Sequence, residues 1–199
     1  MDFLRGPLKD TMKALGSIVD LDFIPFGNAY VVVDACKGKA YPEIRKCWCV
    51  ESVNKNASDA FTGPILWQHG AAEGDGNSIE ACAKQVNGGN TSMAFLECFE
   101  VTHSSSVTSY EACATTAGFT TAQATALKTC FTDPALKLAA VIQAARKTCA
   151  LSPQHDSTPW FVVDGSTGTT GPQESSELEK IVCAAAKAKS IAPLPAVCG

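Results

Sequence analysis

The chain has 199 residues with 16 basic and 20 acidic side chains, which give a formal net charge of −4. A chain of net negative charge lacks the basic surface that neutralises phosphates, so no nucleic-acid partner is expected. Hydrophobic residues make up 46% and charged residues 18% of the sequence, which is typical of a globular protein. No run approaches the roughly 18 apolar residues that span a bilayer, and no apolar signal region follows Met1.

Ten cysteines indicate a protein that matures in an oxidising compartment. They are dispersed, without the paired C-x-x-C motifs that hold zinc, so neither a metal nor another cofactor is expected. Two sequons, at Asn56 and Asn90, lie in polar, turn-rich sequence and predict glycosylation. A protein of such a compartment carries a signal peptide, so we expect this chain to begin downstream of its natural start.

The first part of the chain mixes helical and β patterns. Apolar residues at helical spacing predict a helix over residues 2–15, in which Pro7 either marks the first turn or causes a kink. Apolar residues that alternate with aspartates predict a strand over residues 18–24. A second β-rich piece over residues 30–33 is followed by an irregular stretch that contains Gly and Pro.

From residue 76 to 151 the pattern is helical, in short pieces separated by Gly- and Ser-rich turns. The clearest helix start is Asp133-Pro134, because Asp caps helices and Pro is favoured at the first helical position. Residues 160–163 form an apolar run that ends in Asp164-Gly165, which predicts a buried strand entering a hairpin. The last helix is expected over residues 176–187.

A spaced motif near the middle of the chain resembles the signature of the gamma-interferon-inducible lysosomal thiol reductase family. The matching residues are Gln68, His69, Gly70, Glu73, Asn77 and Cys82. The family signature has two further cysteines where this chain carries Trp67 and Gly74. Residues 20–29 and residues 158–165 are also similar to that family, so the resemblance covers nearly the whole chain in order and spacing.

The resemblance implies one α/β domain over residues 1–199. Its thioredoxin-like sheet would be formed by a core over residues 1–35 and 152–199. An irregular and helical insertion over residues 36–151, held by disulfides, would interrupt this core. The first, central strand of the sheet is missing from the sequence, and its loss would leave rows of backbone groups unpaired. We therefore expect Met1 to be an internal methionine of a longer natural product.

The resemblance also implies an enzyme that reduces protein disulfides in an acidic endocytic compartment. A thiolate of a C-x-x-C pair attacks the substrate disulfide, and the second cysteine resolves the mixed disulfide. In the family this pair immediately precedes the segment that resembles residues 2–4, so no catalytic residue is expected within the chain itself.

Thr158 and Pro159 are the expected substrate-binding residues. The resemblance implies that Pro159 follows a cis peptide bond and faces the C-x-x-C pair, while Thr158 contacts substrate through its backbone. The alternative is an ordinary proline that opens an edge strand. His69 suggests a proton shuttle at acidic pH, but a hydrogen bond that anchors its loop is the favoured interpretation.

Cys47 and Cys49 are the closest cysteine pair, but their spacing does not suit a thioredoxin-type site and no helix start follows them. We interpret them as structural, each with a different partner, and keep a redox role as the alternative. The family pattern implies a disulfide between Cys183 and Cys198 that holds the C-terminal tail. By position, Cys113 and Cys130 are expected to form a second structural pair, although spacing alone does not decide connectivity.

Three hypotheses describe the function. The first is a thiol-disulfide oxidoreductase of the lysosomal thiol reductase type, lysosomal or secreted, which acts on disulfide-containing protein substrates; the chain by itself is expected to be inactive. The alternative is a non-catalytic secreted or lysosomal binding protein that retains the substrate groove. The third is a disulfide-rich helical binding module without redox function. It is distinguished from the others by whether residues 18–24 and 160–163 share one sheet.

Overall fold

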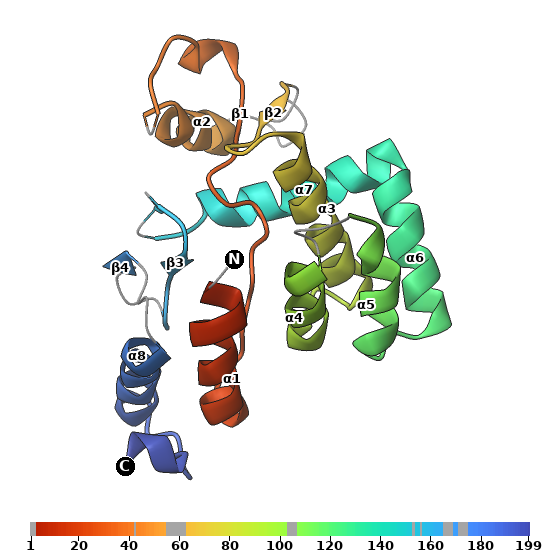
Figure 1. The fold of residues 1–199 in the computed structure, drawn as a ribbon. Coiled ribbons are helices and arrows are strands. Elements are labelled where there is room, and N and C mark those ends of the chain that lie inside the picture. Colours follow the sequence, from red (N-terminus) through yellow and green to blue (C-terminus); the bar gives the residue numbers. More distant parts are fainter. Residues whose placement is uncertain are drawn as a thin grey trace.

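The computed structural model describes residues 3–41, 43–54, 63–102, 107–152, 154–155, 157–164, 169–170 and 175–199. Most of these residues lie in helices, and the few strands are short (Figure 1). No helix within these ranges combines the length and the apolar character needed to cross a lipid bilayer.

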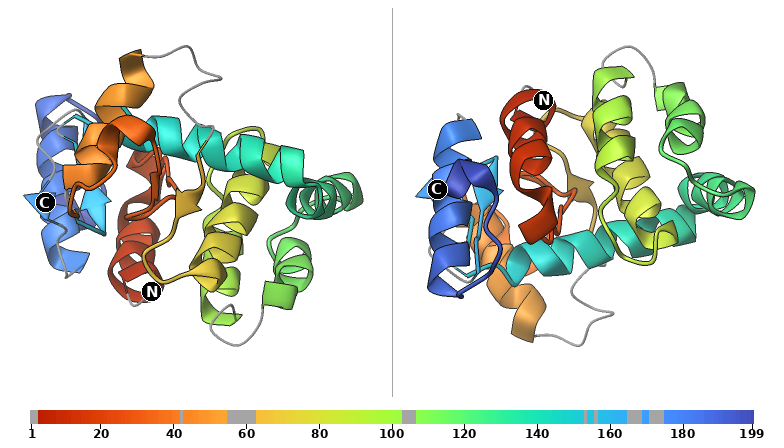
Figure 2. Two further views of the ribbon diagram at one scale, coloured as in Figure 1. Left: turned by 90° about the horizontal axis from the view of Figure 1, so that it is seen from above. Right: turned by 90° about the horizontal axis from the view of Figure 1, so that it is seen from below.

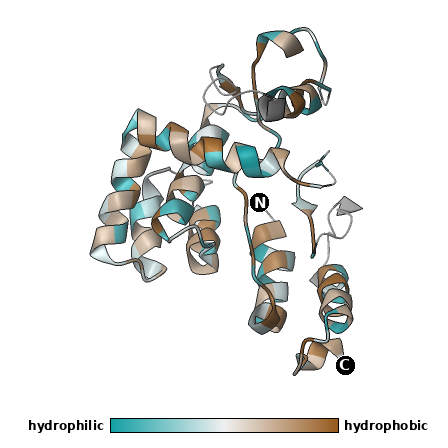
Figure 3. Cartoon of the chain, turned by 180° about the vertical axis from the view of Figure 1, so that it is seen from behind, coloured by the Kyte–Doolittle hydropathy of each residue, from teal (hydrophilic) through white to brown (hydrophobic). Residues whose placement is uncertain are grey.

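Five consecutive helices form a helical unit. They are α3 (Ala71–Val86), α4 (Met93–Thr102), α5 (Tyr110–Thr116), α6 (Thr121–Thr132) and α7 (Pro134–Cys149). The helical character predicted for residues 76–151 is confirmed, although α3 begins before the predicted start. Ile79, Phe95, Phe99 and Leu127 are buried at the centre of the unit. In Figure 3 the helices carry both hydrophilic and hydrophobic stretches, as expected of helices with one buried and one exposed face.

Side chains cap the starts of α6 and α7. Thr120 and Gln123 form a reciprocal capping box, in which the side chain of each accepts a hydrogen bond from the other's backbone N–H. Asp133 accepts hydrogen bonds from two following backbone N–H groups at 2.8 and 3.1 Å, with Pro134 at the first helical position. The predicted start at Asp133-Pro134 is therefore confirmed.

The first and last helices pack against each other. A π-helical turn, η1 (Leu4–Leu8), contains Pro7 and leads directly into α1 (Lys9–Leu15). The turn departs from α-helical geometry because proline lacks the N–H of a regular α-helical ladder. The short 3-10 turn η2 (Gly16–Ile18) ends this segment. Figure 2 shows α1 beside α8 (Ser175–Ala188) from above and below, and Leu15 is buried with Cys183 and Cys198 between them.

Residues 19–24 are not part of a strand, so the strand predicted over residues 18–24 is wrong. The N–H of Phe23 donates to Oγ1 of Thr91 at 2.9 Å, and its carbonyl accepts from Nζ of Lys84 at 2.6 Å. The Asp22 carboxylate forms ion pairs with Lys84 and, at 2.8 Å, with Lys147. Side chains of the helical unit, rather than a neighbouring strand, therefore hold this segment in place.

The strands form two separate antiparallel pairs within the described residues. They are β1 (Tyr30–Val31) with β2 (Ile65–Leu66), and β3 (Trp160–Phe161) with β4 (Thr169–Thr170). Across the described ranges the expected thioredoxin-like sheet is not confirmed, and residues 18–24 share no sheet with residues 160–163. Residues 64–66 lie along one edge of β1, where the Val32 N–H also donates to the Pro64 carbonyl at 3.0 Å. The mixture of helices and short strands remains consistent with the α/β class.

Helix α2 (Glu43–Asn54) lies in the stretch that the sequence analysis interpreted as irregular. Its Trp48 is fully buried and contacts Phe26, with ring centroids 5.6 Å apart. The cluster around Trp48 joins residues 26–33 of the expected core to α2 and α7 of the expected insertion. The division of the chain into a core and an insertion stays a prediction.

Candidate functional site

The side chain of Asn28 joins three segments that are far apart in the sequence. Its Nδ2 donates to Oε1 of Gln68 at 2.9 Å and to Oγ1 of Thr158 at 3.2 Å. Its Oδ1 accepts from Nη1 of Arg45 at 2.6 Å. Asn28, Gln68 and Thr158 come from the three stretches that resemble the thiol reductase family. We call these three residues and Arg45 the Asn28 cluster.

Arg45 on α2 supports the cluster from the interior of the protein. Only 1% of its surface is exposed. Its Nη2 donates to the His155 carbonyl at 2.6 Å, and its Nη1 also donates to the Tyr41 hydroxyl at 3.0 Å. The His155 ring in turn lies 3.1 Å from the Gly27 carbonyl oxygen. One buried guanidinium therefore connects α2 to both the Asn28 turn and the segment before Thr158.

Arg45 is not among the residues predicted from the sequence. The available signal was helical spacing, since Arg45, Trp48 and Cys49 lie at i, i+3 and i+4 and are all buried. A buried face of this kind predicts a helix even where cysteine and arginine replace the usual leucines.

The substrate-binding residues predicted from the resemblance lie at this cluster. The Thr158–Pro159 peptide bond is cis, as the resemblance implied. Thr158 is exposed, and β3 begins directly after Pro159.

The signature residues form the turn that leads into α3. The His69 backbone N–H donates to Oε2 of Glu73 at 2.7 Å, and Nδ2 of Asn77 donates to the Glu73 carbonyl at 2.9 Å. Gly70 has a φ of +85°, a conformation that favours glycine. Glu73 thus links the turn to the first part of α3, while His69 contributes its backbone to the contact.

Trp67 and Gly74, the two positions that depart from the family signature, lie against each other. A Cβ atom at position 74 would lie 2.5 Å from Nε1 of Trp67. The indole also contacts Phe26 edge-on, with ring centroids 5.7 Å apart. At the two positions where the signature has cysteines, the Trp67 indole therefore fills the space that a side chain at position 74 would need.

All ten cysteines of the chain are joined in disulfides, so the chain holds no free thiol. The bonds are Cys36–Cys47, Cys49–Cys149, Cys82–Cys130, Cys98–Cys113 and Cys183–Cys198. The pair predicted between Cys113 and Cys130 is wrong, because the packing of α3 on α6 brings Cys82 to Cys130 and that of α4 on α5 brings Cys98 to Cys113. Cys183 and Cys198 are paired as the resemblance implied. Cys47 and Cys49 bind different partners and form no thiol pair.

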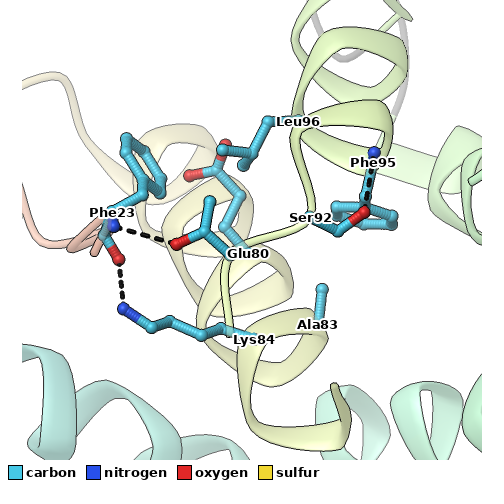
Figure 4. Close-up of a pocket in the computed structure, with 8 residues that line it drawn as sticks. Phe23, Glu80, Ala83, Lys84, Ser92, Phe95 and Leu96 are labelled. Atoms are coloured by element: carbon cyan, nitrogen blue, oxygen red, sulfur yellow. Dashed lines mark hydrogen bonds between the residues drawn. The ribbon is translucent and has the colours of Figure 1, made fainter. Parts of the chain in front are cut away.

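A small pocket between α3, α4 and residues 19–24 holds the buried carboxyl group of Glu80 (Figure 4). Burial, together with the charge of Glu100 and a hydrogen bond to it, raises the pKa of Glu80 well above its ordinary value. None of the described residues that the sequence analysis selected as a site lines this pocket. Within the described ranges, no group of three or more His, Cys, Asp or Glu side chains is placed to hold a metal ion.

The two predicted glycosylation sites differ in what the structure describes. Asn90 is exposed after α3, and its Nδ2 donates to the Asn87 carbonyl at 3.3 Å. Asn56 lies outside the described residues.

Comparisons with known proteins agree on one family. Residues 49–117 match the family model described as gamma interferon inducible lysosomal thiol reductase. A gamma-interferon-responsive lysosomal thiol protein of Arabidopsis thaliana is 28% identical over 186 residues, which cover 92% of this chain and 63% of that protein. A gamma-interferon-inducible lysosomal thiol reductase of Carassius auratus is 25% identical over 199 residues, which cover 100% of this chain and 66% of that protein.

The chain spans less than two thirds of the length of either relative. No solved structure matches it. The family model and the two relatives confirm the resemblance noted from the motif: this chain is similar to the gamma interferon inducible lysosomal thiol reductase family.

Proposed function

We propose that this chain is the substrate-binding part of a thiol-disulfide oxidoreductase that reduces protein disulfides in a lysosomal or secreted setting. The observation that carries the proposal is the junction at Asn28. Three stretches with family resemblance, separated by up to 130 residues, meet through two hydrogen bonds at an exposed surface. Thr158 and Pro159 lie at that surface, where substrate is expected to bind.

The chemistry of the proposal is thiol-disulfide exchange. A thiolate attacks one sulfur of the substrate disulfide, a mixed disulfide forms, and the other substrate sulfur leaves as a thiolate that takes up a proton. A second enzyme thiol then attacks the mixed disulfide, so the enzyme pair is oxidised as the substrate is reduced. Because this chain contains no C-x-x-C pair and its ten cysteines are bonded to partners at least 11 residues away, we propose that the reactive pair is supplied by residues outside these 199.

The test compares the natural gene product, purified from its own cells, with the 199-residue chain. Both are assayed in acidic buffer for reduction of a fluorogenic peptide that contains one disulfide. We expect the natural product to reduce the peptide, a variant with Ser at both reactive cysteines to lose this activity, and the 199-residue chain to show none. A natural product that carries no C-x-x-C pair, or that reduces no disulfide, would overturn the enzyme proposal.

A second candidate is a binding protein without catalysis. It is favoured by the complete pairing of the cysteines, which leaves the chain an intact binding surface but no thiol. Binding of the peptide by the natural product without turnover would support this candidate. The third hypothesis, a helical module unrelated to redox enzymes, agrees with the absence of a shared sheet among the described residues. The similarity to the thiol reductase family argues against it.

A further inference from the structure

The hydrogen bonds of the Asn28 cluster have a defined direction. A guanidinium group only donates hydrogen bonds, so the Asn28 atom that faces Arg45 must be the acceptor Oδ1. The amide group Nδ2 of Asn28 therefore points away from Arg45. It gives its two hydrogens to Oε1 of Gln68 and to Oγ1 of Thr158.

This direction determines what the next two side chains present. With Oε1 of Gln68 turned toward Asn28, the Nε2 donor of Gln68 is turned away from it. The Thr158 oxygen accepts from Asn28, so the hydroxyl hydrogen of Thr158 is left to donate elsewhere. Within the described residues neither donor has a hydrogen-bond partner. Both side chains are exposed.

The surroundings of the two donors fit a polypeptide better than an ion. Both donors are neutral groups, which suit neutral acceptors. Tyr41, which is bonded to Arg45, and Leu66, two residues before Gln68, are each 45% exposed. Neutral donors are suited to the main-chain carbonyls of an extended peptide, and exposed apolar side chains linked to the same cluster through Arg45 and the segment before Gln68 are suited to its side chains.

We propose that Gln68 and Thr158 donate hydrogen bonds to main-chain carbonyl oxygens of an extended polypeptide. Asn28 and Arg45 are the positioning residues that keep both donors turned outward. The inference rests on the proposed function only for the identity of the polypeptide as a disulfide-containing substrate. The binding itself is measurable on the 199-residue chain.

Asn28→Asp tests the direction of the hydrogen bonds. Aspartate has the shape of asparagine and still accepts from Arg45, so the fold is expected to persist with an unchanged or higher Tm. A carboxylate only accepts, however, and it draws the donors of Gln68 and Thr158 inward. Peptide binding should therefore weaken by about tenfold or more. Asn90→Asp, the same charge change at an exposed asparagine elsewhere, should leave binding unchanged.

The probe is an acetylated and amidated peptide with one disulfide, titrated into the isotope-labelled chain and followed by the side-chain amide signal of Gln68 in NMR spectra. Thr158→Val should weaken binding, whereas Thr158→Ser, which keeps the hydroxyl, should retain it. This matched pair decides the question if Asn28→Asp fails to fold.

Equal affinity of a folded Asn28→Asp variant and the parent chain would overturn the proposal. So would acetate shifting the Gln68 signal as the peptide does, because the ligand would then be a carboxylate. If the natural product reduces no disulfide but peptide binding follows the expected pattern, the inference stands and the enzyme proposal fails. If the natural product reduces disulfides and the Asn28→Asp variant binds the peptide normally, the enzyme proposal stands and the inference about the donors fails.

Discussion

Trp67 and Gly74 depend on each other, and the substitution Gly74→Ala tests this directly. The added methyl group would lie 2.5 Å from Nε1 and 2.7 Å from Cδ1 of Trp67. Carbon atoms in optimal contact are about 3.5–4.0 Å apart, so the indole must move away from its contact with Phe26. We expect the free energy of unfolding to fall by about 1–3 kcal/mol, the range found for overpacked cores.

The same substitution should have the opposite sign when Trp67 is replaced by Leu. The three atoms closest to the added methyl group all belong to Trp67. Gly74 lies within α3, where alanine is favoured over glycine by about 0.5–1 kcal/mol. Gly74→Ala should therefore stabilise the Trp67→Leu variant by up to about 1 kcal/mol, which gives a coupling free energy of roughly 2 kcal/mol or more between the two positions.

Urea unfolding of the parent chain, the two single variants and the double variant measures this coupling. Gly6→Ala is the matched control, because its added methyl group would meet no atom within 4 Å beyond its chain neighbours and its own helix backbone, and its effect should be the same in both backgrounds. Equal destabilisation by Gly74→Ala with and without Trp67 would refute the reasoning.

Three further predictions concern bonds elsewhere in the chain. Replacing Cys49 and Cys149 by Ala should lower the free energy of unfolding by about 4 kcal/mol, because their disulfide closes a long loop that the Cys82–Cys130 disulfide shortens only in part. A loss below about 1 kcal/mol in urea unfolding would contradict this prediction. The raised pKa of Glu80 means that its contribution to stability is fully present below the ordinary value of 4.5 and is lost as the pH rises through the raised pKa. Glu80→Gln should therefore reduce the decline in Tm from acidic to neutral pH, and an unchanged pH profile would count against the buried carboxyl group as its cause. Asp133→Ala should lower the stability by about 1 kcal/mol through loss of the α7 cap, whereas Asp133→Asn, which still accepts from the backbone, should have a smaller effect on Tm.

The helices α3 to α8 were predictable because their signals are local. A capping aspartate, a proline at the first helical position and apolar residues at helical spacing act within a few residues. Helix α2 was missed because its buried face is made of arginine, tryptophan and cysteine. The alternating pattern over residues 18–24 was misread as a strand, because strand pairing depends on a partner elsewhere in the chain.

The candidate site was predictable only in pieces. Gln68, Thr158 and the stretch that includes Asn28 were selected from the sequence through the family motif. Their meeting point was not, and neither was the role of Arg45 beneath it. A side-chain hydrogen bond across 130 residues depends on how α2, the signature turn and the Thr158 segment pack, which no local pattern encodes.

The sequence by itself determined the helical middle of the chain, the oxidising compartment that ten cysteines indicate, and the family resemblance. Composition, spacing and local propensity carry these properties. The tertiary structure decided the cysteine partners, the two separate strand pairs and the direction of the hydrogen bonds at Asn28. Cys113 illustrates the difference. Both Cys98 and Cys130 lie at distances along the chain that permit a bond to it, and only the packing of α4 on α5 brings the Cα atoms of Cys98 and Cys113 within 5.4 Å.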